Sequence, residues 1–156
     1  MRYAISVQYI GKNYAGSQIQ FENGKQIALP TIEGELEKAL STLIKNNRCN
    51  TDGYGADLNN NRPVRAIFSG RTDKGVNARG QVVHFDTEEL IVASKFLYSI
   101  NEILPDDISV SDLREVDKSF HAQKSAKKRH YRFEFINRRC KNAFDGDLMR
   151  IKYEIN

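Results

Sequence analysis

The chain has 156 residues, of which 40% are hydrophobic and 28% are charged, and its formal net charge is +4. These values are typical of a single folded domain with a core of its own. No apolar run approaches the ~18 residues of a membrane-spanning helix, and the first residues lack the apolar core of a signal peptide, so we expect a cytoplasmic protein that does not enter a membrane. The two cysteines, Cys49 and Cys140, are typical of free thiols and are too few for a metal site.

A strand and a helix are the first elements that the chain predicts. Residues 2–9 alternate between apolar and polar side chains, which is typical of a β-strand. A loop that contains Gly11 and Gly16 follows the strand. Residues 32–45 carry one apolar face at helical spacing, and Thr31 is a suitable N-cap, so the sequence predicts a core helix.

A long polar stretch, residues 46–63, follows the helix and contains six asparagines. It has no helical or strand periodicity, although a short piece of β-structure within it would be compatible with its residues. Its Gly53-Tyr54-Gly55 segment lacks the remaining glycines and the Lys-Ser/Thr pair of nucleotide-binding loops. We therefore expect an irregular loop without a nucleotide site.

The most informative stretch is a glycine-rich loop between two apolar runs, residues 64–68 and 82–85. Its glycines recur at five-residue intervals and predict a tight, shaped loop between two strands. Asp73 lies on this loop among several cations, which would stabilise its ionised carboxylate and suit it to act as a nucleophile or a base. These cations are Arg71, Lys74 and Arg79. From the spacing alone, a polar surface loop whose charges pair with one another is the more economical interpretation.

A second helix and a strand follow. Residues 93–104 again show one apolar face, and Pro105 ends the predicted helix. Residues 108–113 alternate as a strand. The order strand, helix, strand, strand, helix, strand predicts an α+β fold, an RRM-like or ferredoxin-like sandwich in which an antiparallel sheet carries two helices on one face.

A basic stripe occupies residues 121–141, where eight Lys and Arg residues and one Glu give a net charge of +7, so the remainder of the chain carries −3. Such a stripe favours a localised anionic partner such as a nucleic-acid backbone, although a solvated charged edge is also compatible with it. Residues 131–135 alternate aromatic and charged side chains and predict a strand. We interpret Phe133 and Phe135 as core residues, and Tyr131 as an aromatic that can stack on a base.

Three motifs resemble those of the tRNA pseudouridine synthase A family. Gly70-Arg71-Thr72-Asp73-x-Gly75-Val76-x-Ala78, followed by Gly80-Gln81-Val82-Val83-His84-Phe85, is similar to its active-site signature. The stretch from Phe120-His121-Ala122 to Tyr131-x-Phe133 is similar to a second motif, with Gln123 where many members have Arg. Residues 9–18 resemble the family's first motif, with Ile10 and Ser17 in place of the usual Asp and Trp.

The resemblance implies that the chain isomerises uridine to pseudouridine in the anticodon stem-loop of tRNA, without a cofactor, metal or ATP. It assigns Asp73 as the catalytic residue, Arg71 as its support and a filler of the space left by the flipped base, and Tyr131 as the stack for the uracil. The basic residues Lys127, Lys128 and Arg129 would bind phosphate. Gly70, Thr72 and Gly75 would shape the loop. His84 and His121 are interpreted as structural, and the three histidines of the chain are not expected to form a metal site.

Family members usually continue into a second RRM-like half, so the resemblance implies one catalytic-Asp domain over residues 1–156 and a missing second half. We expect the chain alone to have little activity and to need a complementing C-terminal half, or to form a homodimer. Two non-enzymatic functions remain open. One is a free-standing RRM-like module that binds RNA without catalysis, although the RRM octapeptide is not evident. The other is an interaction domain with an incidental basic stripe.

Overall fold

A computed structural model of the chain describes residues 1–22, 25–26, 29–49, 64–137 and 149–151. The chain divides into two compact units, Met1–Ala126 and Lys127–Asn156, and each is described by itself. The sheet and both helices expected from the sequence lie within the first unit. A single RRM-like domain over residues 1–156 stays a prediction.

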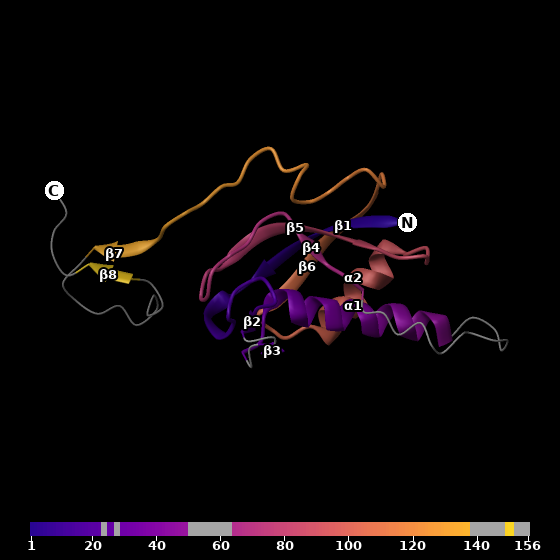
Figure 1. Cartoon of the computed structure of the whole chain (residues 1–156), viewed down its shortest axis with the longest axis horizontal. Helices are drawn as coiled ribbons and strands as arrows, with labels where there is room; N and C mark the ends of the chain where they lie inside the picture. The colour runs from indigo at the N-terminus through magenta and orange to yellow at the C-terminus, as the bar shows by residue number, and fades with distance from the viewer. Residues whose placement is uncertain (23–24, 27–28, 50–63, 138–148, 152–156) are drawn as a thin grey trace. The chain divides into compact units, whose positions relative to one another are not determined.

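The first unit is built on a four-stranded sheet in which each strand runs antiparallel to its neighbours (Figure 1). Its strands lie in the order β4-β5-β1-β6. Their bounds are β1 Arg2–Tyr9, β4 Ile67–Phe68, β5 Ala78–Asp86 and β6 Ile108–Val116. With a helix after the first strand and another after the third, this order confirms the predicted ferredoxin-like α+β fold.

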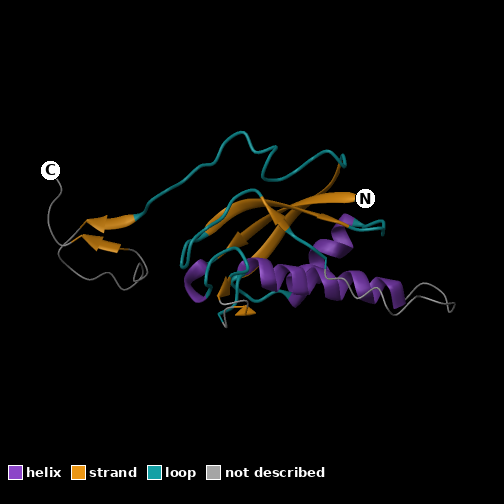
Figure 2. Ribbon diagram, viewed as in Figure 1, coloured by secondary structure: helices purple, strands orange, loops and turns teal. Residues whose placement is uncertain are grey.

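Both helices, α1 (Ile32–Cys49) and α2 (Ala93–Ile103), lie on the same face of the sheet (Figure 2). Alternate residues of β1 point to this face and are buried, which follows from the two-residue period of a strand. The core that they form with the helices includes Tyr3, Ile5, Val7, Leu36, Leu40, Phe85 and Ile100. The Thr31 hydroxyl accepts a hydrogen bond from the Gly34 N–H at 3.1 Å, which confirms the predicted N-cap of α1.

Several short elements complete the described part of the chain. The 3₁₀ turn η1 (Gly11–Asn13) follows β1, and β2 (Phe21–Glu22) pairs with β3 (Lys25–Gln26). In the second unit, β7 (Phe135–Asn137) pairs in parallel with β8 (Met149–Ile151). None of the helices in the described residues is long and apolar enough to cross a membrane.

The observed elements differ from the predicted ones mainly at their ends. Helix α1 continues four residues beyond residue 45, so the predicted loop at 46–63 begins later, and residues 50–63 lie outside the described residues. Strand β6 continues to Val116 because a bulge at Asp112, with φ of 57°, lets pairing with β1 resume. Only two residues of the apolar run at 64–68 form β4, whereas β5 already begins at Ala78.

The predicted strand over residues 131–135 is wrong. The regular strand begins only at Phe135, where β8 provides a partner. Phe133 and Phe135 are 71% and 43% exposed, so they are not core residues, and their rings contact each other with centroids 6.1 Å apart. An alternating pattern specifies a buried face only where a second layer covers it, and these two rings lack that cover among the described residues.

Candidate active site

The Asp73 loop, residues 69–77, connects β4 to β5. The side chain of Asp73 is exposed and makes no ion pair with any described residue. Its carbonyl oxygen accepts a hydrogen bond from the Val76 N–H at 3.2 Å, which closes a tight turn. Gly75 takes part in this turn with φ of +81°, a conformation that favours glycine.

One end of the loop is held through Thr72. The Thr72 N–H donates to Ser17 Oγ at 2.8 Å, and the Ser17 N–H donates to the Thr72 carbonyl at 3.0 Å. The Thr72 hydroxyl lies 2.8 Å from the hydroxyl of Tyr9, which is buried at the end of β1. Burial raises the pKa of Tyr9, so its hydroxyl stays neutral and available for this hydrogen bond. The backbone beside Asp73 is therefore fixed from two directions.

The other end of the loop is held by Gly11. Its N–H donates to Asn77 Oδ1 at 2.8 Å. A Cβ atom at Gly11 would lie 2.1 Å from the carbonyl oxygen of Val76, so only glycine allows this close approach. Both ends of the turn thus rest on the segment that follows β1.

The base of the loop is closed by Gln81 of β5. Its amide Nε2 donates to the Gly70 carbonyl at 2.7 Å, and its Oε1 accepts from the Ser69 hydroxyl at 2.8 Å. The Ser69 N–H donates to the Val82 carbonyl at 2.8 Å and extends the pairing of the two strands. These contacts leave the loop with a fixed backbone and an exposed carboxylate, an arrangement that can present this carboxylate to a substrate as a nucleophile or a base.

The structure places the sequence-predicted residues of this loop together. Gly70, Thr72, Asp73 and Gly75 form it, and Arg71 lies on it with an exposed side chain. No ion pair joins Arg71 to Asp73 among the described residues, so its assignment as a support of the carboxylate stays a prediction.

Sequence reasoning missed the residues that hold the loop. These are Tyr9, Gly11, Ser17 and Gln81. Three of them lie in the 9–18 segment and Gln81 lies in the active-site signature, so the two motifs were the signals that the sequence offered. Helix α1, which the sequence suggested to be core structure alone, also contributes, because its first turn supports Ser17.

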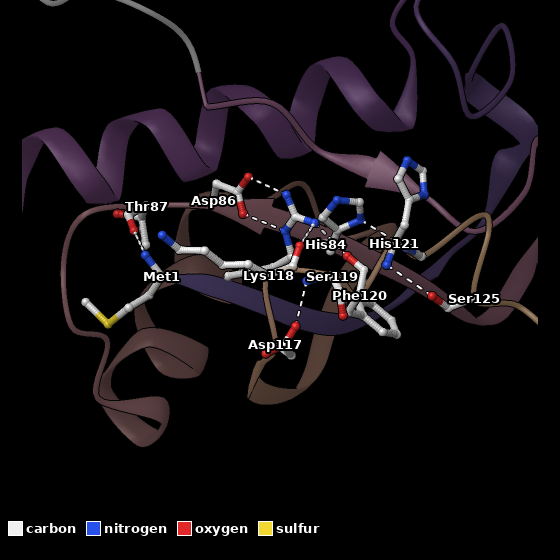
Figure 3. Close-up of polar contacts among 12 residues, drawn as sticks. Met1, His84, Asp86, Thr87, Asp117, Lys118, Ser119, Phe120, His121 and Ser125 are labelled. Carbon is white, nitrogen blue, oxygen red and sulfur yellow. Dashed lines mark hydrogen bonds and ion pairs between the residues drawn. The ribbon is translucent and has the colours of Figure 1, made fainter.

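A turn after β6 holds the start of the second motif, Phe120 to Ala122, against the sheet (Figure 3). The Arg2 guanidinium donates two hydrogen bonds of 2.7 Å to the Asp86 carboxylate and one each to the carbonyls of Lys118 and Phe120. The ion pair lowers the pKa of Asp86, since a neighbouring cation stabilises the ionised carboxylate. Arg2 therefore fastens this turn to β1 and β5.

His84 holds the same turn further along. Its Nδ1 accepts a hydrogen bond from the Ala122 N–H at 3.1 Å, and its ring lies edge-on to Phe120 (Figure 3). Burial, and then the charge of Arg2, lower its pKa, so the neutral ring that can accept this bond is favoured. His84 is a satisfied structural histidine, as expected. The described residues contain no group of three side chains arranged to hold a metal ion.

The remaining predicted site residues belong to the second unit. Tyr131 is 81% exposed, and Lys127, Lys128 and Arg129 are exposed. Three further cations of the basic stripe, Arg138, Arg139 and Lys141, lie outside the described residues. That Tyr131 stacks on the base of a substrate stays a prediction.

Comparison with known proteins identifies relatives of this sequence. The chain is 39% identical over 143 residues to tRNA pseudouridine synthase A of Methylococcus capsulatus, 38% identical over 146 residues to that of Aeromonas salmonicida, and 36% identical over 143 residues to that of Colwellia psychrerythraea. The matches cover 92–94% of this chain and 45–47% of each relative.

No protein-family model matches the chain. The chain spans slightly less than half the length of these curated relatives, which is consistent with an N-terminal half. Over nearly all of its own length, the chain is therefore a homologue of the tRNA pseudouridine synthase A proteins, as its motifs indicated.

Proposed function

We propose that the chain is the part of a tRNA pseudouridine synthase that carries the catalytic aspartate. The observation that carries this proposal is the Asp73 loop, in which a fixed backbone presents one exposed carboxylate within the matching motif. The names of the homologues support the reaction, because each is a tRNA pseudouridine synthase A. The substrate would be a uridine in the anticodon stem-loop of tRNA.

The reaction breaks the N1–C1′ bond of uridine, turns the base, and forms a bond between C5 and C1′. The hydrogen on C5 leaves as a proton and N1 gains one, so the product is an isomer of the substrate. No oxidant, metal or ATP is needed for this balance. Asp73 would act on the ribose or on the base, as a nucleophile or as a base, and both roles suit a carboxylate that reaches solvent.

The uridine must leave its stack for Asp73 to reach it. In this proposal Tyr131 stacks on the extruded uracil, and Arg71 occupies the space that the base leaves. The exposed cations Lys127, Lys128 and Arg129 contact phosphate without reading sequence. Such contacts position an RNA substrate, and they are compatible with a protein that acts on tRNA in the cytoplasm.

A second half would complete the site. Because the chain spans less than half of its relatives, we propose that it acts with a complementing half or as a homodimer, and that alone it is weakly active. The exposure of Asp73 supports this dependence, since a carboxylate open to water lacks the enclosure that strengthens electrostatic catalysis.

The test is tritium release from tRNA labelled at C5 of its uridines, because the C5 hydrogen is lost only when C5 bonds to C1′. The purified chain is assayed alone and together with the remaining half of the Methylococcus capsulatus relative. We expect release in the complemented sample, and a loss on the order of 10³-fold in the Asp73→Asn variant. Equal release by the variant, or no release by any sample, contradicts the proposal.

An RNA-binding module without catalysis is the second candidate, and the exposed Tyr131 with its neighbouring cations favours it. It predicts salt-sensitive tRNA binding and no tritium release under any condition. A pure interaction domain predicts neither. Measurement of tRNA affinity at two salt concentrations, beside the release assay, separates the three functions.

A further inference from the structure

We infer that Ser17 is a positioning residue for Asp73. Its side chain is 1% exposed and forms a hydrogen bond with the backbone of the residue that precedes Asp73. The structural part of this inference, that Ser17 fixes the loop, does not depend on which reaction the chain takes part in. The catalytic part, that Ser17 affects turnover, rests on the proposed function.

Ser17 satisfies both backbone polar groups of Thr72. The Thr72 N–H donates to Ser17 Oγ at 2.8 Å, and the Thr72 carbonyl accepts from the Ser17 N–H at 3.0 Å. The remaining polar group of Thr72, its hydroxyl, is taken by Tyr9. Because all polar groups of Thr72 have partners, the backbone that leads into Asp73 has one favoured position.

The first turn of α1 fixes Ser17 in turn. The Ser17 carbonyl accepts from the Glu33 N–H at 2.9 Å, and the Gly16 carbonyl accepts from the Ile32 N–H at 3.3 Å. These N–H groups have no partner within their own helix, so the segment caps α1 while it supports the loop. Ile32 is fully buried, and the contacts therefore run from the core to the residue beside Asp73.

Gly16 brings this segment close to the loop. Its φ is +132°, and a Cβ atom there would lie 2.9 Å from the Thr72 carbonyl oxygen. The close approach lets Ser17 reach both polar groups of Thr72 at hydrogen-bond distance. The backbone conformation of Gly16 thus places Ser17 for its hydrogen bonds with the Thr72 backbone.

The matched control is Ser41, which has the same chemistry at another place. The Ser41 hydroxyl, on α1, accepts from the Val64 N–H at 3.0 Å. Ser41→Ala and Ser17→Ala each remove one hydroxyl that accepts a backbone N–H and leave that N–H without its partner. Because the two serines lie at different places, an effect at Thr72 that occurs only in Ser17→Ala reports the position of Ser17.

Amide hydrogen exchange tests the fixation in the chain alone. In Ser17→Ala, exchange at Thr72 should become at least about tenfold faster than in wild type, whereas in Ser41→Ala it should stay within about twofold. Unchanged exchange at Thr72 in Ser17→Ala overturns the inference. This readout does not depend on synthase activity, so it stands apart from the proposed function.

Turnover of the complemented chain tests the consequence. Ser17→Ala should lower kcat for tritium release roughly 10-fold to 100-fold, because small displacements of a catalytic group have effects of this size. The KM for tRNA should stay within about twofold, and Ser41→Ala should keep both constants near wild type. Equal losses in both variants, or a change in KM alone, overturn the positioning role. Inactivity of wild type contradicts the proposed function, while the exchange readout still decides the fixation.

Discussion

The Asp73 loop and the basic segment, residues 127–134, differ in how their backbone is held. The loop is held by hydrogen bonds from Tyr9, Gly11 and Ser17, and its backbone is fixed while its carboxylate is exposed. The basic segment has no regular structure, and its side chains are exposed. Within it, Arg132 forms an ion pair with Glu134 at 3.4 Å, and both side chains are exposed.

The difference matches what each region has to do in the proposed reaction. A catalytic carboxylate must hold one geometry, because stabilisation of a transition state depends on groups placed before the reaction starts. Contacts to phosphate tolerate variation, since they act through charge and carry no sequence information. We therefore expect substitutions around the loop to change stability and turnover, and substitutions in the basic segment to change RNA affinity.

The largest effect is expected at Gly11. Gly11→Ala places a Cβ atom 2.1 Å from the Val76 carbonyl, so backbone must shift, at a cost of about 2 kcal/mol of unfolding free energy. Gly80→Ala is the control, since its Cβ would lie 3.6 Å from Ser6 Oγ, an ordinary contact. Urea unfolding of both variants checks this. Equal losses would show that the close packing of Gly11 against the loop is unimportant.

A smaller effect, confined to RNA, is expected at Tyr131. Tyr131→Ala should weaken tRNA binding about fivefold, because one stacking contact with a base is lost. The unfolding midpoint should stay unchanged, because the ring is 81% exposed. Tyr98→Ala on α2, whose ring is 71% exposed, is the control and should leave affinity unchanged. Titration of labelled tRNA measures both. An unchanged affinity in Tyr131→Ala would remove Tyr131 from the RNA interface.

The cations of the basic segment should act through salt dependence. Replacing Lys127 and Lys128 together by Gln should reduce the slope of log affinity against log salt by about 2, roughly one unit for each phosphate contact. Lys95→Gln, an exposed lysine on α2, should leave the slope as it is. A slope unchanged in the double variant would contradict phosphate binding by this segment.

The smallest expected effect is a pH dependence at His84. Its pKa is lowered in the folded chain by burial and by Arg2, so the unfolded chain binds a proton more readily. This difference in pKa contributes stability that is fully present above pH ~6.5, the ordinary pKa of histidine. The contribution is lost as the pH falls towards the pKa of the folded chain. Protonation of Nδ1 would also remove the acceptor of the Ala122 N–H. His84→Asn should flatten the pH profile of the unfolding free energy below pH ~6.5, and a profile identical to wild type would contradict the assignment.

The sequence predicted the layers of the fold because periodicity reports which face of an element is buried. The alternation of β1 and the apolar faces of α1 and α2 were enough for this. Element ends were less predictable. The bulge at Asp112, for example, depends on pairing with β1, which is not local in sequence. The exposure of Phe133 and Phe135 was mispredicted because alternation alone does not reveal whether a second layer exists.

The candidate site was predicted only in part. Asp73 was identified through its motif, whereas Ser17 and Gly11 were not, because hydrogen bonds across more than 50 residues leave no local pattern. Ser17 departs from the motif that it lies in, and its polar contact follows from the backbone that Gly16 allows. Positioning residues of this kind require a structure.

The most direct test is the nucleoside composition of tRNA after incubation with the complemented chain. Digestion and chromatography measure pseudouridine against uridine, with wild type, Asp73→Asn and Lys95→Gln in parallel. We expect pseudouridine at the expense of uridine with wild type and with Lys95→Gln, and none with Asp73→Asn although tRNA is still bound. Pseudouridine formed equally by Asp73→Asn would show that Asp73 is not the catalytic residue.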